Sequence, residues 1–508
     1  MKRMKKIMAL MLAAIMMMAM SVTTFAAGTT CSLTVNAKGG QDLKGQTINL
    51  YKLFDVTESG EGQNKNYAYT VNTQYKATLA SVLGINADSK DEEFAAKVTG
   101  LGKANSTEVQ NFANTFTTKA LEGKLLATAT SGKITEDNNK TSYTFNNLTD
   151  GYYLVYVTGG KEIQSSLVTV DASTTKVDLK TEAPSITKTA NKETAEIGQV
   201  VKYTVKGAIP DTTGYDQYQY IIQDTLSNGL DFVNNATGTA CEGNSVNVTV
   251  AFTGATDAST APTTATIDTN NSKKMSLDLS TWVRANQGNK GKEFTVTYYA
   301  KVNKDAVVTE KNQAQLEYGN DPNNITTTTP SEVKTPTYPL DILKTKKDSN
   351  VNLAGAKFSL YKSETDAKNG TNPIKVTGNN GNYVVDSTST TTEFVSVENI
   401  EGKNYNLHVN GLAGGTYYLV ETKAPDGFNK LTAPVKITIT KSTDADVNNW
   451  TISKDSTPEN DKIIDIANST GSLLPSTGGR GAIAFAVIAA LLVFGVAVSF
   501  IRDKRKEA

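Results

Sequence analysis

The sequence predicts a mainly β protein with three tandem β-sandwich domains, the first carrying a helical insertion, between an N-terminal signal peptide and a C-terminal transmembrane helix. A chain of 508 residues is long enough for about three domains. Stretches that alternate β-branched or aromatic residues with polar ones recur, as at 32–35, 199–205 and 294–299. Such alternation between Gly- and Asn-rich turns is typical of antiparallel sandwiches.

Both ends of the chain look like targeting segments. Residues 1–27 combine a basic start, an apolar run and small residues, which is the pattern of a secretory signal peptide. Residues 481–501 are uncharged and long enough for one bilayer crossing. The basic residues that follow keep the last few residues cytoplasmic. We therefore expect the body of the protein to lie outside the cell.

Proline-marked seams divide the body. The expected parts are a signal peptide over 1–27, an N-terminal domain over 28–183, a middle domain over 184–336, a C-terminal domain over 337–470 and a tail over 471–508. Ala, Leu, Lys and Glu dominate between about 74 and 121, which predicts helices inserted in the first domain. Ser89 to Glu92 resembles a capping box at the start of one of them.

Composition excludes several classes of function. The formal net charge is zero, and the basic residues at the two ends leave a mildly acidic body, which argues against nucleic-acid binding. His408 is the only histidine, which removes most histidine-dependent catalysis and most zinc sites. We expect no metal and no cofactor. A hydrolase built on a carboxylate pair stays open but weak, as does a disulfide between Cys31 and Cys241.

An internal repeat links the first and third domains. Residues 43–52 match 353–362, and residues 148–156 match 412–421 in the same order. Two matched stretches in one order make chance similarity a poor explanation. We therefore expect both domains to be the same sandwich, with the helical insertion added to the first.

The tail resembles the sortase sorting signal of Gram-positive surface proteins, in which Leu-Pro-x-Thr-Gly precedes an apolar span and basic residues. The matching residues are Leu474, Pro475, Ser476, Thr477 and Gly478. Residues 418–428 resemble the E-box of CnaB-like pilin domains. Domain by domain, the chain is similar to the major (backbone) subunits of sortase-assembled pili. This resemblance implies Ig-like, CnaB-like sandwiches, a SpaA-type C-terminal domain and a structural role rather than enzymatic turnover.

The resemblance also implies how the protein is assembled. A sortase would cleave after Thr477 and transfer it to a lysine of the next identical subunit, and finally to peptidoglycan. The implied partners are therefore sortase, identical subunits, minor pilins, peptidoglycan and a host-surface ligand, in a wall-anchored pilus whose precursor spans the membrane transiently. Lys180 lies at the position of the polymerisation lysine, although the Tyr-Pro and Asn that usually flank it are absent. Lys176 is the fallback, and a plain linker lysine is the alternative.

Family members lock their sandwiches with Lys–Asn isopeptide bonds. The matching positions, in the order Lys, acid and Asn, are Lys188, Asp224 and Asn312 in the middle domain and Lys344, Glu421 and Asn468 in the C-terminal domain. Burial lowers the pKa of a lysine and raises that of a carboxyl. A neutral amine can then attack the Asn amide, while the protonated acid hydrogen-bonds the carbonyl and relays protons as ammonia leaves.

The aligned positions of the first domain lack both reactive groups. Thr34 replaces the lysine and Tyr156 replaces the E-box acid, so we expect no isopeptide bond there. In the third domain Lys346 and Lys347 lie close enough to Lys344 for the register to be different. A second function also stays open, which is a non-polymerising wall-anchored adhesin or a minor (tip or base) pilin that binds a host or matrix ligand.

Overall fold

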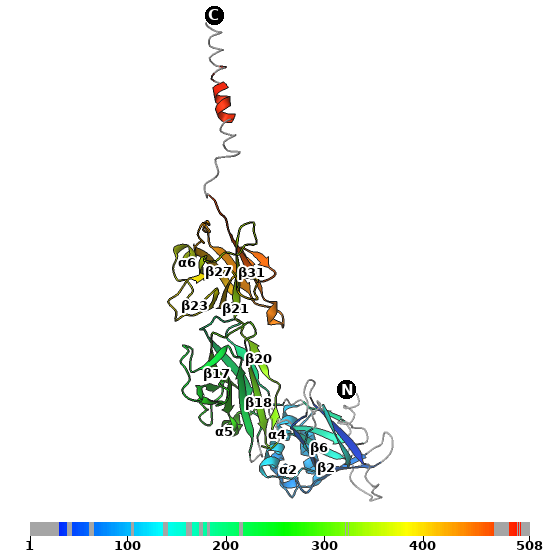
Figure 1. Cartoon of the computed structure of the whole chain (residues 1–508). Coiled ribbons are helices and arrows are strands. Elements are labelled where there is room, and N and C mark those ends of the chain that lie inside the picture. The colour runs from blue at the N-terminus through cyan, green and yellow to red at the C-terminus, as the bar shows by residue number, and fades with distance from the viewer. Residues whose placement is uncertain are drawn as a thin grey trace. The chain divides into compact units, whose positions relative to one another are not determined.

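The computed structural model describes most of the body of the chain. The described residues are 30–37, 43–59, 66–102, 106–135, 141–158, 165–171, 176–179, 183–212, 217–320, 322–323, 325–471, 487–494, 496 and 498. They form two compact units (Figure 1). The first unit comprises 1–193, 199–303 and 310–335, and the second comprises 194–198, 304–309 and 336–508. The boundary predicted at 183 lies inside the first unit, and the domain limits stay a prediction.

The N-terminal part of the first unit is a pair of sheets. One has the strand order β5-β1-β8, and the other has the order β3-β2-β6-β7 with β4 also paired to β2. The strands are β1 (Cys31–Asn36), β2 (Thr47–Ser59), β3 (Asn66–Val71), β4 (Ala129–Lys133), β5 (Ser142–Leu148), β6 (Gly151–Val157), β7 (Ser165–Val170) and β8 (Lys176–Asp178). The predicted strand at 32–35 is therefore confirmed.

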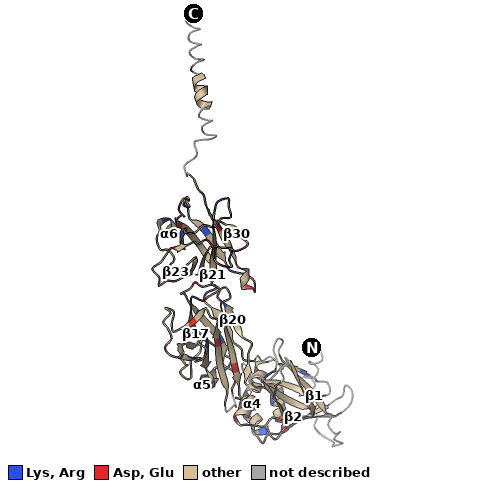
Figure 2. Ribbon diagram, in the orientation of Figure 1, with Lys and Arg blue, Asp and Glu red and all other residues tan. Residues whose placement is uncertain are grey.

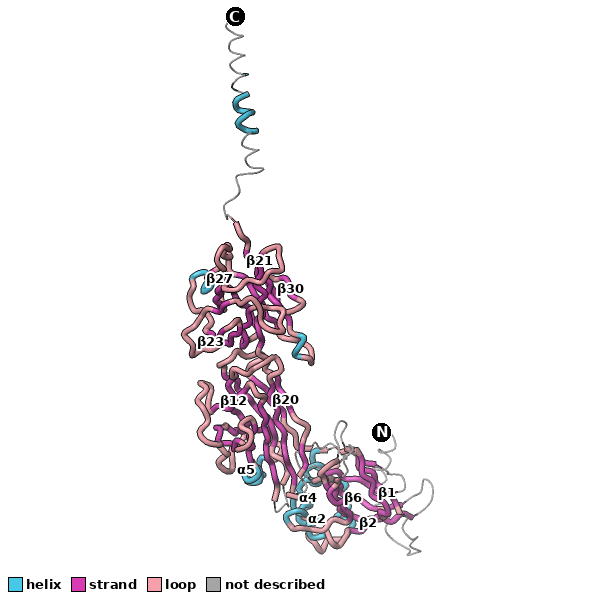
Figure 3. The backbone as a smooth tube through the Cα atoms, viewed as in Figure 1, coloured by secondary structure: helices cyan, strands magenta, loops and turns pink. Residues whose placement is uncertain are grey.

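The expected helical insertion lies between β3 and β4. It consists of α2 (Lys76–Leu83), α3 (Asp91–Gly100) and α4 (Thr107–Glu122), which lie beside β2 and β6 in Figure 3. The capping box predicted at Ser89 is wrong. Helix α3 begins one residue later, with Lys90 as its N-cap, because the Ser89 amide is already bonded to the Asn86 carbonyl in a turn. The side-chain cap is made at α4 instead, where Ser106 accepts a hydrogen bond from the Val109 amide.

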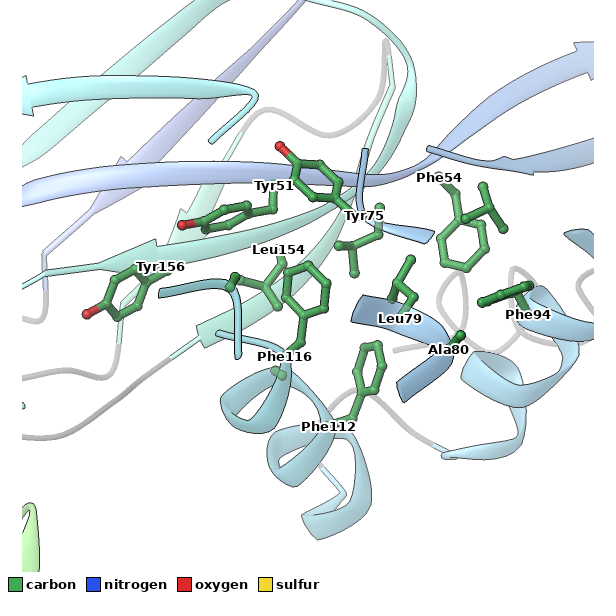
Figure 4. Close-up of a cluster of buried hydrophobic side chains, with 14 residues drawn as sticks. Tyr51, Phe54, Tyr75, Leu79, Ala80, Phe94, Phe112, Phe116, Leu154 and Tyr156 are labelled. Carbon is green, nitrogen blue, oxygen red and sulfur yellow. The ribbon is translucent and has the colours of Figure 1, made fainter. Parts of the chain in front are cut away.

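The inserted helices cover the second face of β6, so this strand is buried on both faces. The two tyrosines Tyr51 and Tyr75 meet Phe116 of α4 edge to face, with ring centroids 5.9 and 6.1 Å from that of Phe116 (Figure 4). Leu154 of β6 is fully buried in the same cluster. Five consecutive β6 residues, 153–157, are consequently buried, whereas a sandwich strand with one solvent face would alternate.

The rest of the first unit is a second pair of sheets. One has the order β12-β17-β10-β9, with β14 on β17, and the other has the order β13-β15-β16-β11-β18-β19, with β20 on β18. The elements are β9 (Thr187–Ala190), β10 (Val200–Ala208), β11 (Gln219–Leu226), β12 (Leu230–Val233), β13 (Ser245–Asn247), β14 (Thr249–Phe252), β15 (Thr264–Ile267), β16 (Lys274–Asp278), α5 (Ser280–Ala285), η1 (Gln287–Asn289), β17 (Glu293–Val302), β18 (Lys311–Gly319), β19 (Thr326–Thr327) and β20 (Ser331–Lys334). The strands predicted at 199–205 and 294–299 are confirmed and pair with each other.

The second unit is one sandwich. Its sheets have the orders β23-β24-β26-β21-β31 and β25-β22-β27-β28-β29-β30. The elements are β21 (Tyr338–Lys346), β22 (Lys357–Tyr361), α6 (Glu364–Asn369), β23 (Val376–Asn379), β24 (Asn382–Val385), β25 (Phe394–Val395), β26 (Leu407–Leu412), β27 (Gly415–Lys423), β28 (Val435–Thr440), η2 (Val447–Asn449), β29 (Thr451–Lys454), β30 (Thr457–Glu459) and β31 (Ile463–Asn468).

Strand pairing supports the internal repeat. β1 pairs antiparallel with β5 and parallel with β8, as β21 does with β26 and β31. β2 pairs with β6, and β6 with β7, as β22 pairs with β27 and β27 with β28. In each sandwich the first strand therefore lies beside the last, which places the two ends of the chain segment in contact.

The tail is only partly described. Residues 487–494 are helical, but most of the expected crossing at 481–501 lies outside the described residues. Within the part of the chain that is described, no helix has the length and apolar character needed to cross a membrane. Among the described residues, no disulfide joins Cys31 and Cys241. Lys and Arg are interspersed with Asp and Glu along the ribbon in Figure 2.

We predict that the aromatic cluster under the helices controls the stability of the N-terminal sheets. Phe116→Ala removes a fully buried ring and leaves a cavity, so it should lower the free energy of unfolding by about 3–5 kcal/mol. The measurement is denaturant unfolding of the ectodomain. Leu126→Ala is the matched control because Leu126 is 78% exposed and should change the value by under about 0.5 kcal/mol. Equal effects of the two changes would contradict the prediction.

Candidate cross-linking sites

The middle-domain residues come from two facing sheets. Lys188 lies on β9, whereas Asp224 and Asn312 lie on the neighbouring strands β11 and β18 of the other sheet. All three positions fall on the inward side of strands whose burial alternates. The register pairs Leu226 with Asn312, so Asp224 is two residues away on the same face. The fold therefore directs one amine across the core toward one acid and one amide.

These three side chains are excluded from water. Lys188 is 5% exposed, Asp224 1% and Asn312 0%. Lys188 Nζ donates to Asp224 Oδ2 at 2.5 Å. The amine also lies over the rings of Tyr203 and Tyr298, 4.9 and 4.7 Å from their centroids. The sequence-predicted residues are thus brought together, in a pocket with aromatic walls.

Burial shifts the pKa values of the lysine and the acid at this centre. It lowers the pKa of Lys188 against the opposing pull of Asp224, and it raises the pKa of Asp224 against the pull of Lys188. Both directions favour the uncharged forms, a free amine and a protonated acid. Among the described residues, Asp224 Oδ1 and Asn312 Oδ1 find no hydrogen-bond partner. Two orphaned oxygens at one centre are satisfied when a proton on the acid bonds the amide carbonyl.

The C-terminal residues are arranged differently. Lys344 lies on β21 and Asn468 on β31, which are parallel neighbours in one sheet, and Glu421 lies on β27 of the facing sheet. Lys344 pairs with Ile466, so Asn468 is two residues further along the same face. Here the amine and amide are side by side, and the acid approaches from across the core.

The contacts of the second centre are also buried. Lys344 is 0% exposed, and Glu421 and Asn468 are each 1% exposed. Lys344 Nζ lies 3.7 Å from Glu421 Oε1 and donates to the Ile466 carbonyl at 3.4 Å. Asn468 Nδ2 donates to Glu421 Oε2 at 2.8 Å and to the Asn429 carbonyl at 2.6 Å. The acid therefore contacts both reacting groups.

Burial lowers the pKa of the lysine in the second centre as it does in the first. Burial lowers the pKa of Lys344 to about 8, although Glu421 acts in the opposite direction. The unpaired oxygens are again those of the acid and the amide, Glu421 Oε1 and Asn468 Oδ1, within the described part of the chain. Two unrelated geometries leave the same pair of atoms unsatisfied, which is the pattern expected where a shared proton completes the site.

In the first sandwich, the residues equivalent to Lys344 and Glu421 are not the ones aligned from the sequence, and the absence of a bond there stays a prediction. Tyr153 donates its hydroxyl to the carbonyl four residues earlier, as Tyr417 does, so these two residues correspond. Val157, rather than Tyr156, is then the equivalent of Glu421. Strand pairing likewise makes Ala37, rather than Thr34, the equivalent of Lys344, because Val35 opposes β5 as Ile342 opposes β26. A shorter loop after β1 displaced the alignment of Thr34, whereas Tyr156 was displaced by a one-residue gap that the strand registers do not require.

A buried lysine does occur in the first sandwich without the rest of the centre. Lys52 is 6% exposed, and its amine donates to Thr149 Oγ1 at 2.6 Å and pairs with Asp55. The Asp55 side chain is 53% exposed, so its carboxylate stays hydrated. Lysine burial alone is therefore no signature of cross-linking, and the buried acid beside an amide is the distinguishing feature.

The sequence did not indicate Tyr298. This residue lies on β17, is fully buried, and places its hydroxyl against Lys188, Asp224 and Asn312. An alternating strand at 293–302 marks it as an inward residue, but tyrosines at such positions are common in sandwich cores. Only the three-dimensional packing brings it to the centre.

The polymerisation residues are described only in part. Lys180 and the sorting signal at 474–478 lie outside the described residues. Lys176, the fallback, is exposed on β8 at the edge of its sheet.

Two family models match the chain. Residues 197–322 match the Gram-positive pilin backbone subunit 2, Cna-B-like domain, and residues 339–452 match the SpaA prealbumin-like fold domain. The first match contains Asp224 and Asn312, and the second contains Lys344 and Glu421. No curated protein matches the sequence.

Several solved pilins resemble the chain at low identity. The T6 backbone pilin of Streptococcus pyogenes is 16% identical, with 88% of this chain and 100% of that chain covered and a TM-score of 0.44. The major pilin SpaD of Corynebacterium diphtheriae is 17% identical, with 89% and 100% covered and a TM-score of 0.41. The major pilin SpaA of the same species is 17% identical, with 87% and 100% covered and a TM-score of 0.39.

The assignment rests on the two family models, which together contain four of the six cross-linking residues predicted from the sequence. The chain therefore carries the Cna-B-like domain of Gram-positive pilin backbone subunits and a SpaA prealbumin-like domain, which makes it a pilin backbone subunit.

Proposed function

We propose that this backbone pilin is locked internally by two self-formed isopeptide bonds, Lys188–Asn312 and Lys344–Asn468. The supporting observation is that each lysine is buried beside one acid and one asparagine whose oxygens are otherwise unsatisfied. Lysine and aspartate are almost never fully buried without a compensating interaction. A reaction that converts the amine into an amide and uses the acid as a proton carrier accounts for the burial of both side chains.

The proposed reaction balances without a cofactor. The neutral lysine Nζ attacks the asparagine Cγ, and a new C–N bond forms. The acid, Asp224 or Glu421, donates a hydrogen bond to the amide oxygen and stabilises its developing charge. One proton leaves Nζ, one reaches Nδ2, and Nδ2 departs as ammonia. The acid ends in the protonation state in which it began, so each centre reacts once.

The two bonds restrain the sandwiches differently. Lys188–Asn312 would join the facing sheets of the middle domain, whereas Lys344–Asn468 would join the first and last strands of the second unit. Each closes a loop of 124 residues. In the chain-entropy model used for disulfides, such a closure stabilises the fold by about 4–5 kcal/mol. Because Lys344–Asn468 would tie the first strand of the second unit to its last, tension there would pass through a covalent bond.

Polymerisation is the second half of the proposal. Sortase would cleave between Thr477 and Gly478, and Lys180 of the next subunit would accept the Thr477 carbonyl. The span at 481–501 would hold the precursor in the membrane until cleavage. The finished polymer would then be joined to peptidoglycan and would carry minor pilins, with a host-surface ligand as a further partner. The sorting-signal sequence supports this order of events.

We predict two losses of ammonia in the secreted ectodomain. Intact mass should fall about 34 Da below the sequence value, because each bond between an amine and a primary amide releases one ammonia. Asp224→Asn and Glu421→Gln should each prevent one bond, so that one of the two losses of about 17 Da is no longer seen. Peptide mapping would locate the bonds. Zero losses would overturn the chemistry, and three would show that the first sandwich reacts as well.

We predict a pH-dependent stability when Lys344 is left unbonded by Asn468→Ala. The pKa of Lys344 is about 8 when folded, below about 10.4 for an unfolded lysine. Between these values the unfolded chain binds more protons, so stability should rise with pH from about 8 to about 10. The measurement is denaturant unfolding at several pH values. The control, Lys344→Met with Asn468→Ala, should lack this rise, and an identical slope in both proteins would contradict the prediction.

We predict that Lys180→Ala abolishes the high-mass ladder of covalent polymers in wall extracts, because the Thr477 acyl group then lacks its acceptor. Lys176→Ala, the matched control on the exposed edge strand β8, should leave the ladder intact. Denaturing gel electrophoresis distinguishes the two. A ladder that survives the double change would refute both lysines as acceptors. Loss in Lys176→Ala alone would assign the role to Lys176.

A further inference from the structure

Tyr298 places a hydroxyl at the centre of the middle-domain site, where the Lys-acid-Asn pattern assigns no group. Its side chain points inward from β17 and is 0% exposed. The Lys188 amine donates to this hydroxyl, and the hydroxyl donates to Asp224 Oδ2. Asn312 Nδ2 also donates to it, at 3.3 Å. One oxygen therefore contacts the attacking nitrogen, the acid and the nitrogen that must leave.

In the second unit, a different group contacts the leaving nitrogen. There the acid itself accepts a hydrogen bond from the leaving nitrogen, since Asn468 Nδ2 donates to Glu421 Oε2 at 2.8 Å. The Lys344 amine has the Ile466 carbonyl and Glu421 as its hydrogen-bonding neighbours among the described residues. Glutamate is one methylene longer than aspartate, so it can reach both reacting groups. The shorter Asp224 is supplemented by the tyrosine hydroxyl.

We propose that Tyr298 is a catalytic residue of the Lys188–Asn312 bond, whose hydroxyl relays a proton from the attacking to the leaving nitrogen. The inference rests on the cross-link proposed above. As the bond from Nζ to Cγ forms, the hydroxyl oxygen accepts a proton from Nζ. It gives its own proton to Nδ2, directly or through Asp224, and Nδ2 leaves as ammonia. The hydroxyl is restored, and no other reactant is needed.

A tyrosine hydroxyl suits this relay because it donates and accepts at once. Burial, reinforced by the nearby Asp224 carboxyl, raises the pKa of Tyr298 far above its usual value, so the group remains a neutral phenol. A direct transfer from Nζ to Nδ2 would pass through a strained four-membered arrangement. A bridging hydroxyl enlarges the ring and keeps the hydrogen bonds close to linear, which is the geometry that proton transfer needs.

Tyr203 provides a matched control within the same pocket. Its ring stacks on that of Tyr298, with centroids 5.8 Å apart, and lies 4.9 Å from the Lys188 amine. Its hydroxyl, however, is directed to Thr335 Oγ1, at 3.5 Å. Tyr203→Phe and Tyr298→Phe therefore each delete one buried hydroxyl and retain one aromatic wall, but only the second deletes the group on the reacting atoms.

The test compares the rates of bond formation in the full ectodomain. Chains are pulse-labelled in cell-free translation, quenched in acid at intervals and digested, and the Lys188–Asn312 and Lys344–Asn468 peptides are quantified by mass. Tyr298→Phe should slow the first bond at least tenfold and leave the second unchanged. Tyr203→Phe should leave both at the wild-type rate. The second bond serves as an internal clock for folding.

The possible outcomes distinguish the proton relay from the cross-link on which it rests. Absence of the Lys188–Asn312 peptide from the wild type would overturn the proposed cross-link itself. A wild-type rate in Tyr298→Phe, with the bond present, would overturn only the relay. Should Tyr298→Phe fail to fold, 3,5-difluorotyrosine at position 298 keeps the shape and hydroxyl but makes the phenol more acidic. A rate at least threefold different from the wild type is then expected, and an unchanged rate would refute the relay.

Discussion

The architecture of both centres depends on keeping a lysine amine out of water. An isolated ammonium in a sandwich core is too costly to retain, so the amine must lose its proton or gain a partner. Asp224 and Glu421 supply that partner, and burial raises the pKa of Asp224. Burial lowers the pKa of both lysines, so each amine is favoured in its neutral form next to an acid and an amide. The strands, their registers and the aromatic walls are the means by which the sandwich holds this combination dry.

One chemistry is built on two frameworks. In the first unit the amine crosses the core to the opposite sheet, and in the second it faces an amide on the adjacent parallel strand. In both frameworks the acid lies on a strand that faces the lysine. The amide lies two residues from the residue that pairs with Asp224 in the first framework, and two residues from the residue that pairs with Lys344 in the second. Because successive side chains in a strand point to opposite faces, residues two apart lie on the same face. In the middle-domain centre the hydroxyl of Tyr298 also contacts both nitrogens.

Sequence patterns predicted most of this fold because burial alternates along the strands. The strands at 199–205 and 294–299 and the helical insertion followed from periodicity, and the six candidate residues that the resemblance named lie together at two buried centres. The registers did not follow. The loop before Leu43 is shorter than that before Leu353, which put Thr34 in place of Ala37, and a one-residue gap in the second match put Tyr156 in place of Val157. Tyr298 could not be predicted, because its role depends on a contact between strands far apart in sequence.

The first sandwich shows why the centre and the helices are alternative ways to stabilise the same topology. Where Glu421 and Lys344 stand in the second unit, Val157 and Ala37 supply apolar contacts in the first. Its helices bury the outer face of β6 and add an aromatic cluster of their own. Packing of this kind is reversible and spread over many weak contacts, whereas an amide bond between strands does not yield under load. With the proposed cross-links in place, a chain that carries both would confine its covalent resistance to the sandwiches in which lysine, acid and asparagine meet.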